Sequence, residues 1–185
     1  TSAGIFLGTT YLFYFIYGYE FLQHTYFYHV TRADHRHNFS LYFYQLYLSV
    51  CSENAHQVTP LLAFLPQVVL LLGLAYRLGS RRHIATCICC QTVSFVALNK
   101  VYTVQYFVWY MALLPLTLAR GQLPSLQVSL VLALGILIGM GCWLWHAYQL
   151  EFLGRPVWLP LLASSSLLFF AHVALFVALV RRTAT

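Results

Sequence analysis

The sequence predicts an all-α protein that crosses a membrane about six times. Of its 185 residues, 61% are apolar or aromatic and only 8% are charged, whereas an ordinary soluble domain has roughly 25% charged residues. The apolar residues form long runs without strict alternation, which favours helices over a transmembrane barrel. Several runs approach the roughly 20 residues that a helix needs to cross the hydrocarbon core. A soluble globular domain is therefore excluded.

The predicted spans follow directly from the apolar runs. No repeat, low-complexity tail or flexible linker divides the chain, so residues 1–185 are predicted to form one transmembrane region. The third and fourth runs are short for a full crossing. The six runs are 3–22, 58–76, 84–99, 104–119, 127–147 and 157–180.

The arginines predict the orientation of the spans. Six of them, in three clusters, follow the second, fourth and sixth runs, so these clusters lie on one side, which the positive-inside rule makes cytoplasmic. Segments 23–57, 100–103 and 148–156 then face the lumen or the exterior. The glycosylation sequon Asn38-Phe39-Ser40 agrees with a lumenal loop. The arginines concerned are Arg77, Arg81, Arg82, Arg120, Arg181 and Arg182.

The predicted lumenal loop 23–57 contains an aromatic segment, 41–48, that is too short to span and too apolar to be a solvated linker. We expect it to lie in the membrane interface, where tyrosine rings are favourable. The first 50 residues contain 9 tyrosines, and the whole chain contains 14. This pattern is typical of an interfacial aromatic belt, and it also suits a platform for a lipid or a sugar ring.

Two polar islands carry the candidate chemistry. In the first, Arg32 and Arg36 can bind phosphate oxygens, and Asp34 can orient an arginine or accept a hydroxyl proton. His37 and Asn38 can bond to sugar hydroxyls. An ordinary wet loop remains the alternative, and a metal bound by His35-x-His37 is a weaker one, since two histidines without further ligands make a poor site.

The second island follows residue 98. Lys100, the only lysine, is expected either to extend its ammonium to the interface or to face a lipid phosphate, with Gln105 and Tyr106 beside it. Both islands are predicted on the same face, which suggests a shared pocket. Three cysteines, Cys87, Cys89 and Cys90, lie in an apolar run. At this spacing on a helix their thiolates would not point toward one zinc ion, so we expect them to be buried small apolar residues.

The polar motifs resemble the family of glycosylphosphatidylinositol (GPI) mannosyltransferase I catalytic subunits. The resemblance rests on Glu-Phe-Leu-x-His-x-Tyr-x-Tyr-His-x-Thr-Arg-x-Asp-x-Arg-His-Asn-Phe-Ser from Glu20 to Ser40. It continues at Asn99-Lys100-Val101, at Gln105-Tyr106-Phe107-x-Trp109-Tyr110, and at Leu150-Glu151-Phe152-x-Gly154. Together with the chemistry of the two polar islands, the resemblance gives ten candidate substrate-binding residues: Glu20, His24, Arg32, Asp34, Arg36, His37, Asn38, Lys100, Gln105 and Tyr106.

The resemblance implies a multi-pass enzyme of the endoplasmic reticulum membrane, similar to the GT-C class of glycosyltransferases. It implies transfer of mannose, α1,4-linked, from dolichol-phosphate mannose to a phosphoinositide glycolipid, glucosaminyl-phosphatidylinositol. The implied partners are these two lipids, the surrounding membrane lipids and a small membrane-anchored regulatory subunit. No nucleic acid or cofactor is expected, and no residue is assigned as a metal ligand. The family's Asp-x-Asp motif has no match here, so no catalytic residue is assigned and the chain is expected to be a carboxyl-terminal part.

Two other classes remain open. A polytopic transporter would also place polar islands between apolar helices, but ionisable residues near the middle of spans and internal repeats would be expected. His172 is the clearest ionisable residue inside a predicted span, and a hydrogen-bonded neutral ring is expected there. A non-catalytic membrane subunit would not need the dense Arg-Asp-His-Asn segment.

Overall fold

The protein is mainly helical in the residues that a computed structural model describes, which are 2–28, 36–51, 60–121 and 124–183. No strand occurs among them, so the predicted all-α class is confirmed. The helices are α1 (Ser2–Tyr17), α2 (Tyr19–Leu22), the π-helix η1 (Gln23–Phe27), α4 (Phe43–Cys51), α5 (Pro60–Leu78), α6 (Ile84–Leu98), α7 (Gln105–Ala119), α8 (Leu126–Glu151) and α9 (Trp158–Thr183).

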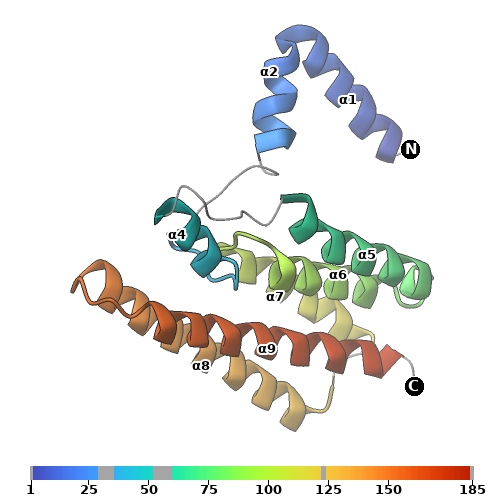
Figure 1. Cartoon of the computed structure of the whole chain (residues 1–185). Helices are drawn as coiled ribbons and strands as arrows, with labels where there is room; N and C mark the ends of the chain where they lie inside the picture. The colour runs from blue at the N-terminus through green and yellow to red at the C-terminus, as the bar shows by residue number, and fades with distance from the viewer. Residues whose placement is uncertain (1, 29–35, 52–59, 122–123, 184–185) are drawn as a thin grey trace. The chain divides into compact units, whose positions relative to one another are not determined.

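Two compact units make up the chain, Thr1–Ala33 and Asp34–Thr185, and each is described by itself. In the first unit, the apolar run 3–22 does not form one continuous helix, because the helix breaks at Gly18. Gly18 has φ 70° and ψ −158°, a conformation that favours glycine. Figure 1 shows α1 and α2 as two arms that meet at this bend. The second arm continues through η1 to Tyr28.

Tyr26 joins the two arms of the first unit. Its hydroxyl lies 2.9 Å from Thr10 Oγ1, and its ring packs edge-on against Phe6 and Phe21 at 6.2 and 6.0 Å between centroids. Most other large apolar side chains of α1 remain exposed. The rings of Phe13 and Phe21 also pack across the bend, at 5.6 Å between centroids. The first unit is therefore held by a few aromatic contacts and a hydrogen bond rather than by a buried core.

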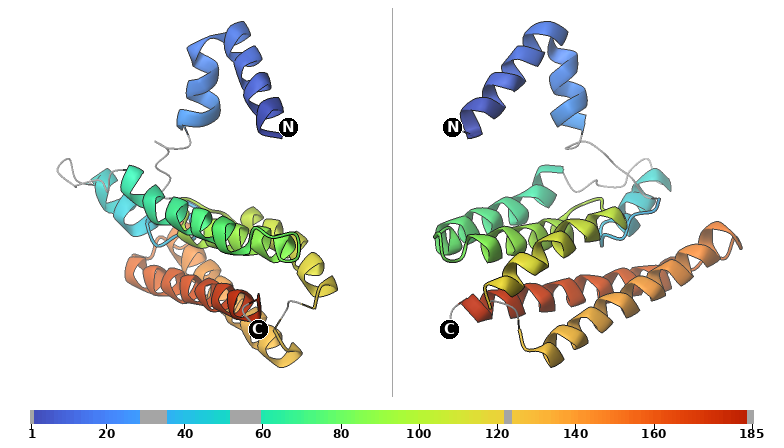
Figure 2. Two further views of the ribbon diagram at one scale, coloured as in Figure 1. Left: turned by 90° about the vertical axis from the view of Figure 1, so that its right-hand side faces the viewer. Right: turned by 180° about the vertical axis from the view of Figure 1, so that it is seen from behind.

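The second unit is a bundle of long helices. Helix α6 contacts α5, α7 and α9, and α8 packs along α9, as the views in Figure 2 show. Gly139 permits the α8 and α9 backbones to approach closely, because a Cβ built there would lie 3.0 Å from Leu168 Cα. Gly135, one turn earlier, faces Ala171. This is the small-xxx-small pattern of helix pairs in membranes.

Two helices of the described chain, α8 and α9, are long and apolar enough to cross a membrane, with 26 residues each. Shorter apolar helices cover Ser2–Tyr17, Phe64–Leu78, Ile84–Leu98 and Gln105–Ala119. The last five predicted runs each coincide with one helix, with ends shifted by a few residues. Their helical state is confirmed, and the number of crossings stays a prediction.

Six arginines, which follow α5, α7 and α9 or end them, gather at one end of the second unit. Arg120, after α7, donates from Nη1 to the carbonyl oxygens of Arg81 and Arg82 at 3.3 and 3.4 Å. Arg181 and Arg182 lie in the last turn of α9, and Figure 1 shows this end of α9 on the same side of the second unit as the α5–α6 turn. The segments 36–40, 99–104 and 152–157 lie at the opposite end. The three arginine clusters that predicted the orientation therefore lie at one end of the folded second unit.

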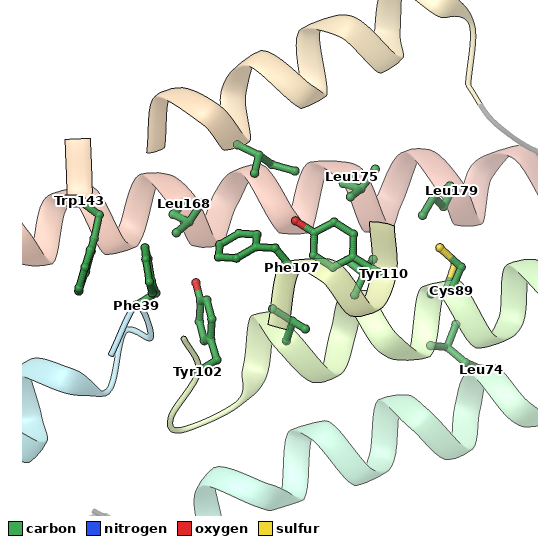
Figure 3. Packing of buried hydrophobic residues seen from close by; sticks show 14 of the residues in the cluster. Phe39, Leu74, Cys89, Tyr102, Phe107, Tyr110, Trp143, Leu168, Leu175 and Leu179 are labelled. Carbon is green, nitrogen blue, oxygen red and sulfur yellow. The ribbon is translucent and has the colours of Figure 1, made fainter. Parts of the chain in front are cut away.

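The core of the second unit combines aromatic rings with leucines of α9 (Figure 3). Cys87, Cys89 and Cys90 are at most 2% exposed, which confirms their expected role as small buried residues. His172 is fully buried, and its Nδ1 lies 2.8 Å from the Leu168 carbonyl oxygen. Because a carbonyl only accepts, Nδ1 carries the hydrogen, and in the neutral ring Nε2 accepts from the Tyr110 hydroxyl at 3.3 Å.

Candidate functional site

Asn38 joins the two polar islands through its side-chain amide. Its Oδ1 accepts hydrogen bonds from the backbone N–H groups of Ser40 at 3.0 Å and Tyr102 at 3.2 Å. Its Nδ2 donates to the carbonyl oxygen of Lys100 at 3.0 Å. The Ser40 hydroxyl donates to the same carbonyl at 2.6 Å. Asn38 is 1% exposed, so the nitrogen that a glycan would occupy is enclosed and already hydrogen-bonded.

Phe39 anchors the same segment in the core. Its backbone N–H donates to the carbonyl oxygen of Tyr102 at 3.0 Å, and its ring stacks on Trp143 with centroids 4.0 Å apart. Figure 3 shows Phe39 between Trp143 and Tyr102. A second ring contact reaches Phe107 at 5.7 Å. The polar segment before Phe39 is therefore held at a defined place on the bundle.

This anchoring leaves Arg36 and His37 exposed at the end of the bundle. His37 has φ 52°, a left-handed conformation that is uncommon for residues other than glycine. Both residues line a pocket of about 450 Å³ whose other walls come from α4, from the end of α8 and from the start of α9. The pocket is lined by Arg36, His37, Tyr47, Leu150, Glu151 and Trp158.

Glu151 brings the opposite charge into the pocket. It is the last residue of α8, and its Oε1 lies 3.5 Å from His37 Nδ1. The side chain of Glu151 is 31% exposed and that of His37 is 72% exposed, so solvent screens this pair and it contributes little to stability. Tyr47 and Trp158 form a stacked aromatic wall with centroids 3.6 Å apart.

The arrangement suits recognition of a charged and hydroxylated ligand. A guanidinium can bind phosphate oxygens, a carboxylate and an imidazole can bind hydroxyls or an amine, and the stacked rings offer a flat apolar face. Within the described residues, no group of three or more His, Cys, Asp or Glu side chains is placed to hold a metal ion.

Lys100 lies on the other side of the Asn38 contact and is not among the described residues that line the pocket. It is 9% exposed, and burial lowers the pKa of its ammonium because desolvation penalises the charged form. Burial also raises the pKa of the neighbouring Tyr102, with a further contribution from Tyr110. Lys100 contacts the first polar island through its backbone carbonyl oxygen, which accepts hydrogen bonds from Asn38 and Ser40.

The remaining predicted residues are placed separately. Glu20 and His24 pair across 3.5 Å on the first unit and are both exposed. Gln105 begins α7 and is exposed, while the half-buried Tyr106 packs on Trp109 at 4.2 Å between centroids. Arg32 and Asp34, together with His35 of the possible His-x-His metal pair, lie outside the described residues. The structure therefore gathers Arg36 and His37 in the pocket and joins Asn38 to the Lys100 backbone.

Sequence reasoning did not assign Glu151, Tyr47 or Trp158 to the site. Glu151 was part of the last quoted motif, and it is the only Asp or Glu after Glu53 in the chain. The signal that could have pointed to Glu151 was its position as an isolated carboxylate at the predicted end of an apolar span. Its partner His37, however, lies 114 residues earlier in the sequence.

Comparison with known proteins identifies similar sequences. The family model described as Mannosyltransferase (PIG-M) matches residues 1–180. GPI mannosyltransferase 1 of Neurospora crassa is 46% identical over 178 residues, covering 92% of this chain and 37% of that protein. GPI mannosyltransferase 1 of Dictyostelium discoideum is 39% identical over 190 residues, covering 97% of this chain and 42% of that protein.

A vertebrate protein is similar to the same degree. The GPI alpha-1,4-mannosyltransferase I catalytic subunit of Danio rerio is 45% identical over 155 residues, covering 83% of this chain and 38% of that protein. The chain thus spans about two fifths of the length of these curated relatives. No solved structure matches it significantly.

Proposed function

Because the chain belongs to the mannosyltransferase (PIG-M) family, we propose that it forms a substrate-binding part of a GPI α1,4-mannosyltransferase. The proposed reaction transfers mannose from dolichol-phosphate mannose to glucosaminyl-phosphatidylinositol. The names of the relatives support the GPI mannosyltransferase activity. The pocket lined by Arg36, His37 and Glu151 is the observation that carries the proposal to particular residues.

The pocket's chemistry matches the proposed substrates. Both lipids carry a phosphate and a sugar at the membrane surface, and Arg36 can bind phosphate oxygens while the Tyr47–Trp158 wall supports a sugar ring. Lys100, at the same end of the bundle, is the cation proposed for the donor phosphate. That phosphate gains charge as mannose departs, so a nearby ammonium stabilises the transition state more than the ground state.

The membrane arrangement is part of the same proposal. We place the pocket end of the bundle in the lumen of the endoplasmic reticulum and the arginine end in the cytoplasm, following the positive-inside rule. Four apolar helices in addition to α8 and α9 support a multi-pass topology of about six spans in a GT-C type enzyme. A small membrane-anchored regulatory subunit completes the proposed assembly.

Arg36→Ala in the complete enzyme tests the function of the pocket. Microsomes supplied with radiolabelled dolichol-phosphate mannose and glucosaminyl-phosphatidylinositol should lose transfer by about 10-fold or more, as expected when a charge-assisted contact is removed. Arg155→Ala is the matched control, because Arg155 is exposed near the same end and bonds to Gln149 at 3.4 Å. Full transfer by Arg36→Ala at equal abundance would remove this pocket from the reaction.

A further inference from the structure

Glu151 is an unusual residue in this chain. The sequence contains only four Asp or Glu residues. Among the described residues of the second unit, Glu151 is the sole carboxylate, and it lines the pocket. Charged side chains near an apolar bundle are costly and are generally retained for function.

Within the part of the chain that the structure describes, Glu151 pairs with His37, and a ligand can readily exchange this ion pair. His37 Nδ1 is 3.5 Å away, a long contact, and His37 is 72% exposed at the side chain. A pair of this kind is weak in water. A cationic group of a ligand can therefore replace His37 as the partner of Glu151 at little cost in free energy.

Arg36 supplies the opposite charge in the same pocket of about 450 Å³. A pocket with a guanidinium, a carboxylate and a stacked aromatic wall is complementary to a ligand that carries an anion, a cation and a sugar ring. Glucosaminyl-phosphatidylinositol has these three features, since its phosphate is an anion and the free amine of its amino sugar is protonated near neutral pH.

We propose that Glu151 is a specificity-determining residue that binds the protonated amine of the acceptor sugar, while Arg36 binds the phosphate of the same lipid. This inference rests on the proposed function and goes further, because it assigns the pocket to the acceptor and gives the basis for choosing an unmodified amino sugar. An N-acetylated sugar would bring no cation to Glu151, so it would lose this charge-assisted hydrogen bond.

Three acceptors separate charge from size in the test. The complete enzyme is assayed with glucosaminyl-, glucosyl- and N-acetylglucosaminyl-phosphatidylinositol; the second replaces the amine by a hydroxyl of similar size. The unaltered enzyme should prefer the amine over the hydroxyl by about 10- to 100-fold in kcat/KM, the range for a charge-assisted hydrogen bond. Glu151→Gln should abolish this preference, because it lowers transfer to the glucosaminyl acceptor more than transfer to the glucosyl acceptor.

The control is Arg155→Gln, which changes a charge a few residues away and should keep the preference. Retention of the preference by Glu151→Gln would overturn the proposal. The proposal would also be overturned if the unaltered enzyme transferred mannose equally well to the glucosaminyl and glucosyl acceptors. This second test needs no variant, so it can be made even if Glu151→Gln fails to accumulate. Transfer to none of the three acceptors would instead overturn the proposed function, so the two failures are distinguishable.

Discussion

The side-chain amide of Asn38 donates a hydrogen bond to the backbone carbonyl oxygen of Lys100, 62 residues later, across 3.0 Å. Both residues are buried at the same end of the bundle. The contact connects the segment that presents Arg36 and His37 to the turn between α6 and α7. A structural hydrogen bond therefore supports the geometry of the candidate pocket.

Asn38→Ala should destabilise the protein as well as reduce transfer. The substitution leaves the backbone N–H of Tyr102 and the carbonyl of Lys100 with fewer partners in a buried site. Each buried polar group left unsatisfied costs about 1–3 kcal/mol. Thermal unfolding in detergent, followed by tryptophan fluorescence, should show a lower Tm. Gln105→Ala, at an exposed position, is the control for stability, and equal Tm values for the two variants would contradict the structural role of Asn38.

Gly139→Ala should weaken the packing of α8 on α9. The added Cβ would lie 3.0 Å from Leu168 Cα, so the backbones must separate, and such overpacking costs about 1–3 kcal/mol. Gly141→Ala is matched to it on the same helix, because nothing lies within 4 Å of a Cβ at that position. The control should be neutral or slightly stabilising, since alanine has the higher helix propensity. Comparison of the two Tm values decides the prediction, which fails if Gly139→Ala is no less stable than Gly141→Ala.

The pocket end should face the lumen. His37→Cys places a thiol at a position whose native side chain is 72% exposed. In sealed microsomes, with Cys51 replaced by serine, a membrane-impermeant maleimide should label this thiol only after permeabilisation. Arg81→Cys, at the arginine end, should be labelled in sealed microsomes. The reverse labelling pattern would overturn the orientation.

Lys100→Gln should reduce transfer without destabilising the fold. Burial lowers the pKa of Lys100, so the unfolded chain binds this proton more tightly than the folded chain. The resulting penalty on stability applies below the folded pKa and is relieved as the pH rises through that value toward the unfolded pKa. Neutral glutamine removes the penalty, so Tm near pH 7 should stay equal or rise.

Kinetics of the same variant separate two roles of the ammonium. If Lys100 stabilises the departing donor phosphate, Lys100→Gln should raise KM for dolichol-phosphate mannose, lower kcat, or both. Unchanged kinetics at equal abundance would assign Lys100 to anchoring at the membrane interface.

Local sequence determined the helices and the distribution of charge. Apolar runs and arginine positions depend on neighbours within a few residues, so the last five helices and the common end of the arginines were predictable. The bend at Gly18 was not predicted, because the apolar run continues through it and glycine tolerates both helical and left-handed conformations.

Tertiary structure decided which polar groups meet. An asparagine amide can bond to a sugar or to a backbone, and only the packing of Phe39 on Trp143 turns Asn38 toward the Lys100–Tyr102 backbone. The pairing of His37 with Glu151 likewise requires the end of α8 to lie beside the segment before α4, a contact between distant parts of the chain. Such proximity arises from the burial of apolar surface across the whole bundle, which no local pattern encodes.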